Sequence, residues 1–301
     1  SLTMPKTHDR EFFYKFYTCD AAKVVLSKLE VRWSSPLTFN DPFDTQFDLN
    51  VKFDSAELGA AFREKFKCFV MGDEEPAYLL HPRFDLLLRQ LRQQRDRVPW
   101  GTFEQQISSA NDTGFTNMQR AITDSNSQWK SYLAGIRMYC VSEIHDDLLM
   151  WAHYAKAHTG VVLKFRCIAE KDTALCAARP VTYRDDIPPL ATKDEWIAGL
   201  LGVAGMDLPK RFTDMAFIKS IHWSYEKEWR AVAFLTGRTD ELYSTYNIWP
   251  DEIDAVYLGC RISERDREDI TRTVDATLKH VKIFEAKANS ERFALDFRQI
   301  N

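Results

Sequence analysis

The chain has 301 residues, 45% hydrophobic and 28% charged, so it can bury a large core as one elaborated domain or two small ones. It contains no apolar run long enough for a membrane span and no signal-sequence pattern, and its six cysteines lack CxxC spacing. We therefore expect a cytoplasmic protein with reduced thiols and no bound metal. The net charge of −4 gives no overall attraction to nucleic acid or anionic lipid.

The N-terminal stretch predicts a strand, a helix and a second strand. Aromatic residues fill 12–17, Thr18 is a typical N-cap for a helix over 20–29, and a further strand covers 31–34. Ser35 precedes a proline and therefore ends the second strand.

The loop 39–44, with the sequence FNDPFD, has the composition of a tight turn. Asn40 and Asp41 stand before a proline, where short polar side chains bond to nearby backbone amides. One interpretation is structural: Asp41 and Asp44 hold a loop whose phenylalanines plug the core. The other is an acidic rim of Asp41, Asp44 and Asp48, which lacks the spacing of a calcium loop.

Residues 55–134 have helical character and are predicted to form an insertion. Leu58, Phe62, Phe66 and Phe69 recur at helical spacing, and further helices are expected over 83–97 and 115–133. The arginines of 89–97 favour a solvated helix face, with contact to nucleic acid as the alternative.

The sheet pattern returns in 135–301. Strands are expected over 137–143, 160–167, 180–184, 255–259, 281–286 and 293–297, with a helix capped by Ser263. The balance predicts an α+β fold with a mixed or antiparallel sheet, in which 1–54 and 135–301 form the core of one continuous domain and 55–134 is inserted into it.

A helix is expected over 148–158, ending at Gly160. Helical spacing places His153, Tyr154 and His158 on one side of it. These side chains either hydrogen-bond to buried backbone or donate to a ligand. The histidines are five residues apart, and no HExxH motif is present, so a zinc helix is not predicted.

The stretch 222–234, HWSYEKEWRAVAF, predicts a strand from Tyr225 to Phe234. Alternation along a strand would place Glu226, Glu228 and Arg230 on one face. That row is either an exposed charge ladder on an edge strand or a cleft whose carboxylates bind hydroxyls or stabilise a developing cation.

Several of these motifs together resemble an uncharacterised bacterial family, the domain of unknown function 2971. They are FYKF at 13–16, RWSSP at 32–36, FNDPFD at 39–44, MWAHY at 150–154 with HTG at 158–160, and WSYEKEWR at 223–230. The resemblance implies a family without implying a reaction, and it gives functional weight to Asp41, His153, His158, Glu226 and Glu228.

The order of an aromatic strand, a strand ending in serines and a late Glu-x-Glu strand is also similar to ADP-ribosyltransferases. That resemblance implies NAD as a substrate and Glu228 as the catalytic carboxylate, with Glu226 beside the acceptor. It further implies ligand contacts from Tyr14 or Lys15 and from Ser34 or Ser35. The first strand has neither the His nor the Arg that those enzymes use there, so His153 on a helix would have to supply part of the contact to NAD.

Two other classes remain open. The same cleft, with Asn40, Asp41, Tyr154, His158 and Arg230 around it, would serve a non-catalytic nucleotide sensor or partner-binding module in phage defence or stress response. A metal-dependent hydrolase would use Asp41, Asp44, His153 and Glu226.

Overall fold

The computed structural model describes residues 6–235 and 240–301 and confirms the α+β class. The chain forms two compact units. The first contains the residues up to Gln46, Leu133–Asp185 and the residues from Phe217 on, and the second contains Phe47–Tyr132 and Asp186–Ala216. The second unit therefore holds the stretch expected as an insertion, apart from its last two residues, together with a later segment.

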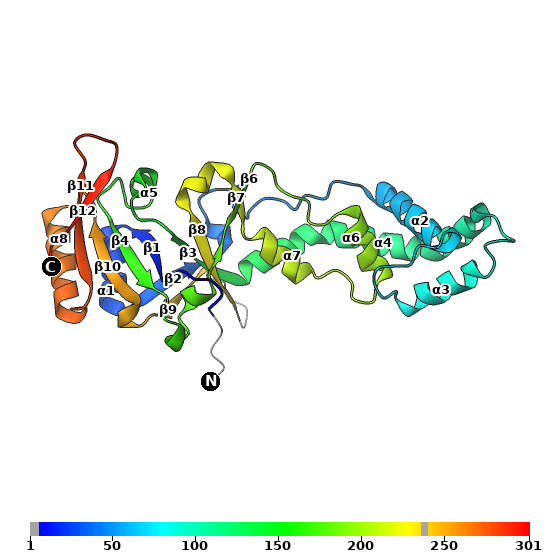
Figure 1. Cartoon of the computed structure of the whole chain (residues 1–301), viewed down its shortest axis with the longest axis horizontal. Helices are drawn as coiled ribbons and strands as arrows, with labels where there is room; N and C mark the ends of the chain where they lie inside the picture. Colours follow the sequence, from blue (N-terminus) through cyan, green and yellow to red (C-terminus); the bar gives the residue numbers. More distant parts are fainter. Residues whose placement is uncertain (1–5, 236–239) are drawn as a thin grey trace. The chain divides into compact units, whose positions relative to one another are not determined.

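Ten strands of the described residues form one mixed sheet in the first unit (Figure 1). The order is β12-β11-β10-β4-β1-β3-β2-β9, with β8 paired to β3 and β5 paired to β8. The bounds are β1 Phe12–Tyr17, β2 Glu30–Ser34, β3 Ile136–Ser142, β4 Val161–Arg166, β5 Arg179–Pro180, β8 Glu228–Phe234, β9 Tyr243–Asn247, β10 Ile253–Leu258, β11 Lys282–Ala288 and β12 Leu295–Gln299. A separate pair joins β6 (Thr182–Arg184) to β7 (Ile218–Ser220) in parallel.

The sheet opens between two of its central strands. β1 pairs with β4 along six residues but with β3 only at Tyr14 opposite Ser142. Farther along the same edge of β3, strand β2 makes one pair, Ser34 opposite Met138, because β8 occupies the whole of the other edge. The separated strands leave room for side chains between them.

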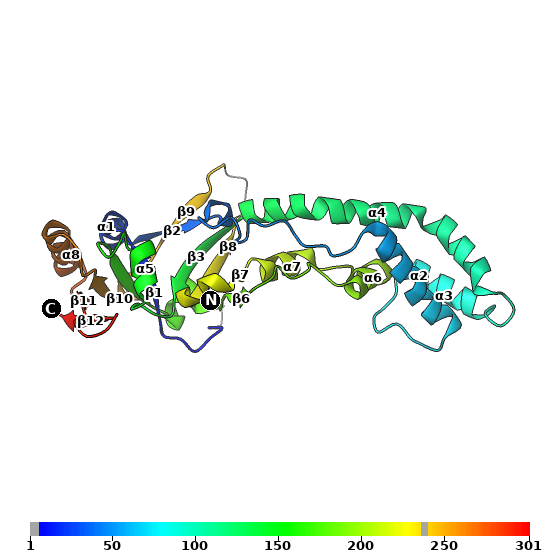
Figure 2. The same cartoon turned by 90° about the horizontal axis from the view of Figure 1, so that it is seen from above.

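Helices cover both faces of this sheet (Figure 2). On one face, α1 (Cys19–Lys28) and α8 (Glu264–Thr277) pack together over the odd-numbered residues of β4. On the other, α5 (Leu148–His153) packs Met150 and Trp151 against Phe16 and Val162. Short 3-10 helices complete the unit: η1 Pro36–Thr38, η2 Ala169–Lys171, η3 Ala174–Ala177, η4 Ile221–Glu226 and η5 Pro250–Glu252.

The second unit is helical and has buried apolar residues of its own. Its helices are α2 (Ser55–Met71), α3 (Pro82–Arg92), α6 (Lys193–Leu201), α7 (Leu208–Met215) and α4 (Trp100–Ala134), whose last two residues belong to the first unit. Phe62, Phe66 and Trp129 are almost completely buried there. None of the described helices combines the length and the apolar character needed to cross a membrane.

The helix predicted over 148–158 is wrong in its second half. Helix α5 ends at His153, and Lys156, Ala157 and His158 all have positive φ, which continues the chain as a wide turn. Gly160 closes that turn against β1, where a Cβ would lie 2.2 Å from the carbonyl oxygen of Tyr17. This close backbone approach requires glycine at position 160.

Candidate functional site

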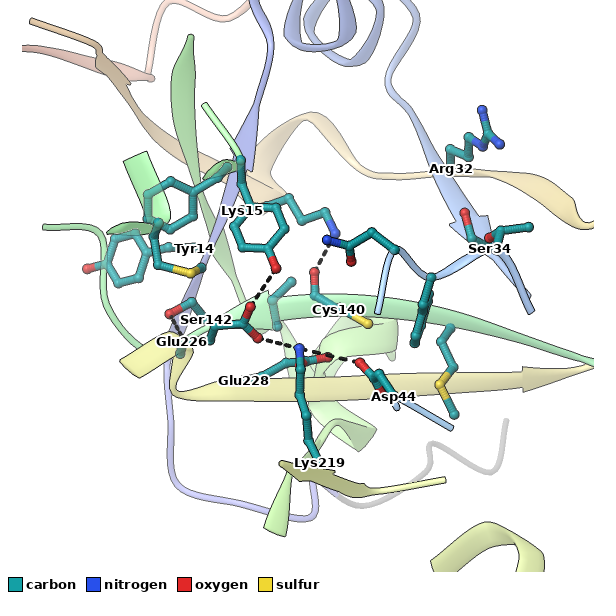
Figure 3. A pocket seen from close by; sticks show the side chains of 18 residues that line it. Tyr14, Lys15, Arg32, Ser34, Asp44, Cys140, Ser142, Lys219, Glu226 and Glu228 are labelled. Atoms are coloured by element: carbon teal, nitrogen blue, oxygen red, sulfur yellow. Dashed lines mark hydrogen bonds and ion pairs between the residues drawn. The ribbon is translucent and has the colours of Figure 1, made fainter. Parts of the chain in front are cut away.

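A cavity of about 340 Å³, lined by both charged and apolar side chains, opens in the first unit where β1 separates from β3 (Figure 3). Its walls come from β1, β2, β3, the loop after η1, α5, β7 and the turn from η4 into β8. The lining residues are Tyr14, Lys15, Phe16, Arg32, Ser34, Thr38, Phe39, Asn40, Asp44, Met138, Cys140, Val141, Ser142, Met150, Tyr154, Lys219, Glu226 and Glu228.

Five charged side chains form a buried cluster at this cavity. Lys219 Nζ lies 2.5 Å from Glu226 Oε2, 2.8 Å from Glu228 Oε2 and 3.4 Å from Asp44 Oδ2. Arg230 donates from Nη2 to both oxygens of Asp44 at 2.8 Å and from Nε to Glu228 Oε1 at 2.7 Å. Three carboxylates therefore face two cations, which leaves one net negative charge when all five groups are ionised.

A sharp turn, and not an extended strand, brings the two glutamates together. The strand predicted from Tyr225 begins only at Glu228, because Glu226 ends η4 and Lys227 adopts a left-handed conformation with φ 46°. Ser142 anchors the turn by donating to the carbonyl oxygen of Glu226 at 2.6 Å. The prediction that strand alternation aligns Glu226 with Glu228 is therefore wrong, although both carboxylates reach the cavity.

The two glutamates differ in their protonation. Burial raises the pKa of Glu226 to about 7, with Lys219 opposing that rise. Burial would also raise the pKa of Glu228, but Arg230 and Lys219 together hold it well below its usual range. Near neutral pH, Glu228 is therefore ionised, while Glu226 can gain or lose a proton.

Two further groups complete the cavity wall. Tyr154, which directly follows α5, donates its hydroxyl hydrogen to Glu226 Oε1 at 2.5 Å. Lys15 spans the opening between the strands and donates from Nζ to the Cys140 carbonyl oxygen at 2.6 Å. Burial lowers the pKa of Lys15, and no ion pair fixes its ammonium within the described residues.

The cavity brings together seven of the twelve residues proposed from the sequence as catalytic or ligand-binding: Tyr14, Lys15, Ser34, Asn40, Tyr154, Glu226 and Glu228. Two others are engaged elsewhere. Ser35 is buried and donates its hydroxyl hydrogen to the Leu133 carbonyl oxygen. Asp41 accepts from the indole nitrogen of Trp223 at 2.6 Å and from the Phe43 amide, which ties the loop in the manner of the structural interpretation.

The remaining three do not line the cavity. His153 is exposed. His158 lies in the turn after α5 with its ring stacked on Trp151, 6.3 Å between centroids. Arg230 is fully buried and contacts residues that line the cavity, pairing with Asp44 and Glu228 and lying over the ring of Phe39.

The sequence analysis did not identify Lys219, and it assigned Asp44 only a role in holding the loop, in an acidic rim or in a metal site. Lys219 lies on β7, which has three residues and is too short to show the alternation of polar and apolar residues that marks a strand. The strand lies between α7 and the 3-10 helix η4. Its one sequence signal is a lysine inside the largely apolar run 215–221, MAFIKSI. Asp44 gave a weaker signal still, since an aspartate after Asn-Asp-Pro is ordinary turn composition.

The three carboxylates of the cluster surround the ammonium group of a lysine and not a metal site. In the part of the chain that the structure describes, no group of three or more His, Cys, Asp or Glu side chains could hold a metal ion. Lys219 Nζ occupies the point on which Asp44, Glu226 and Glu228 converge. The set expected for a metal-dependent hydrolase is not assembled, because His153 is exposed and Asp41 is bonded to Trp223.

Residues 150–231 match a family described as Protein of unknown function (DUF2971), in agreement with the resemblance found in the motifs at 150–154, 158–160 and 223–230. The match runs from α5 into β8 and includes Tyr154, Lys219, Glu226, Glu228 and Arg230. No curated protein and no solved structure matches the chain.

Proposed function

We propose that the cavity binds NAD or a related nucleotide and that the protein is an ADP-ribosyltransferase or NAD glycohydrolase with Glu228 as the catalytic carboxylate. One observation carries the proposal: three separate segments line the same cavity. They are β1 with Tyr14 and Lys15, β2 with Ser34, and the turn into β8 with Glu226 and Glu228. These are the segments that the resemblance to ADP-ribosyltransferases implies.

The charge states of the glutamates suit that reaction. The bond between the ribose and nicotinamide breaks, nicotinamide leaves with the bonding electrons, and the sugar carbon becomes oxocarbenium-like. Glu228 stays ionised and stabilises this positive charge. The acceptor, or water, bonds to the sugar carbon and gives up a proton, which Glu226 can take because its pKa is about 7.

The distribution of charge in the cavity also suits a nucleotide. The buried cluster leaves one negative charge near the site of the developing cation. Lys15 and the exposed Arg32 line the same cavity, and neither forms an ion pair with a carboxylate of the described residues. They are available to the phosphates of the ligand.

One observation favours a second function, a non-catalytic nucleotide sensor. Both oxygens of Glu228 already accept hydrogen bonds from the protein, Oε1 from Arg230 and Oε2 from Lys219. A carboxylate held in this way needs no catalytic role to explain its burial. Such a sensor would bind NAD without consuming it.

The test is incubation with NAD, in which nicotinamide release and the shift of the melting temperature are measured together. We expect release by the wild type and a loss of at least about 100-fold in Glu228→Gln, with the NAD-induced shift retained. The matched control is Glu268→Gln, which changes an exposed carboxylate on α8 in the same unit and should leave release unchanged.

Glu228→Gln also removes a charge from a buried cluster and can lower stability. Tyr154→Phe, which deletes only the hydroxyl that contacts Glu226, is therefore measured beside it and should also slow release. A shift without release would favour the sensor, and the absence of both would refute nucleotide binding of this type.

A further inference from the structure

A second cavity lies on the opposite face of the same strands. Side chains alternate along β2, so that Arg32 and Ser34 line the first cavity while Val31 and Trp33 line the second. The second cavity measures about 410 Å³, within the range of small-molecule sites. No residue lines both cavities, and nothing in the proposed function requires the second.

Aromatic rings form much of the wall of this second cavity. Trp33 stacks on Tyr139 with 5.7 Å between centroids and contacts Tyr246 at 5.1 Å. Trp249 lines the cavity as well and is 54% exposed, which is unusual for so large an apolar ring. Such walls suit a flat ring that stacks.

The ring of Trp33 forms part of this wall, but its nitrogen does not face the second cavity. Trp33 is 5% exposed, and its Nε1 is buried with no hydrogen-bond partner among the described residues. Trp33 can therefore contact a ligand through its ring and not through its N–H.

An acceptor is available from the same wall. Glu252 is 5% exposed, and its Oε1 accepts from the Trp249 amide at 2.8 Å. Within the described residues, its Oε2 accepts no hydrogen bond and the carboxylate makes no ion pair. The second cavity thus offers one free acceptor between aromatic walls.

We propose that the second cavity binds a small flat aromatic molecule of the nucleobase or aromatic-carboxamide type, which stacks on the aromatic wall and donates a hydrogen bond to Glu252. A purely apolar ring would leave the Glu252 oxygen unsatisfied, and a metal ion would make no use of the aromatic walls. A planar ring that carries an N–H donor uses both features.

The test follows indole N–H resonances in protein labelled with [¹⁵N]tryptophan, with adenine and nicotinamide as probes. Trp33→Phe identifies the Trp33 resonance among those of the eight tryptophans. We expect a saturable shift of this resonance with at least one probe and none with toluene, and at least about a tenfold weaker affinity in Glu252→Gln, which loses a bond to a charged group.

Two controls make the result specific. Trp196 in the second unit also has a buried, unpartnered Nε1 but does not line the second cavity, so its resonance should stay in place. Glu226→Gln alters only the first cavity and should leave the shift unchanged. A Trp33 resonance that moves with neither probe would show a cavity filled by water and overturn the proposal. Equal shifts of Trp33 and Trp196, equal affinity in Glu252→Gln, or a shift lost in Glu226→Gln would overturn it as well.

Discussion

At the scale of single residues, Glu226 differs from the other members of the buried cluster. Asp44 and Glu228 each accept from Arg230, whereas Glu226 is held by Lys219 and the hydroxyl of Tyr154. A neutral donor opposes the desolvation of a carboxylate less than a second cation does. Glu226 is therefore the member of the cluster whose charge changes near neutral pH.

This difference predicts a pH dependence of stability. The folded state holds the proton of Glu226 with a pKa of about 7, above the ordinary value of 4.5. Its contribution to stability is therefore fully present below about pH 4.5 and is lost as the pH rises through about 7. Between those values the wild type should lose roughly 3 kcal/mol of unfolding free energy relative to Glu226→Gln, at 1.36 kcal/mol per pKa unit. Urea unfolding of both proteins across this range tests the prediction, and parallel curves would contradict it.

At the scale of elements, the helix that precedes Tyr154 depends on its cap. Helix α5 has six residues, and Asp147 Oδ1 accepts from the Met150 amide at 2.9 Å. We expect Asp147→Ala to cost about 1 kcal/mol of unfolding free energy, and Asp147→Asn to cost much less because asparagine also caps. Urea unfolding of the two variants measures this. Equal losses would indicate that the charge of Asp147 matters more than its hydrogen bond.

Elements with strong local signals were predictable from the sequence. The aromatic run gave β1, and Thr18 and Ser263 marked the first turns of α1 and α8, where the structure shows both side chains accepting the expected amide hydrogen bonds. The first half of α4 was missed because residues 100–114 are largely polar and lack apolar periodicity. Strand β7 has three residues and exists through its pairing with β6, which no local pattern encodes.

The candidate site was predictable only in part, for the same reason. Glu226 and Glu228 stand out as a charged pair in an aromatic stretch, and their neighbours on β1 and β2 follow from strand order. Lys219 and Asp44 reach the cluster through tertiary contacts, from a short strand and an irregular loop. The histidines were expected on a helix face that the left-handed turn after His153 removes.

At the scale of the whole molecule, every residue that lines the first cavity belongs to the first unit. That unit also contains two hydrophobic clusters, one on each face of its sheet. The second unit buries its own phenylalanines, and Trp129 packs on Phe212 with 5.5 Å between centroids. Each unit therefore has the buried apolar residues of an independent fold.

Removing the second unit would leave two pairs of chain ends to be joined, Gln46 to Leu133 and Asp185 to Phe217. Gln46 donates from its side chain to the Phe39 carbonyl oxygen, and the Leu133 carbonyl oxygen accepts from Ser35, only four residues earlier. Asp185 follows β6 and Phe217 precedes β7, which are adjacent parallel strands of three residues each. Gly-Ser linkers of about eight and about six residues can span such gaps, at roughly 3.3 Å per extended residue.

We therefore expect the first unit to fold alone when Phe47–Tyr132 and Asp186–Ala216 are replaced by these linkers. The shortened chain should unfold cooperatively and keep the indole N–H shifts of its own tryptophans, because these rings pack within the first unit: Trp33, Trp151, Trp223, Trp229 and Trp249. Loss of cooperativity, or collapse of these shifts toward those of an unfolded chain, would show that the sheet needs the helical unit. Retained shifts would show that the first unit, which contains every residue that lines the first cavity, folds without the second.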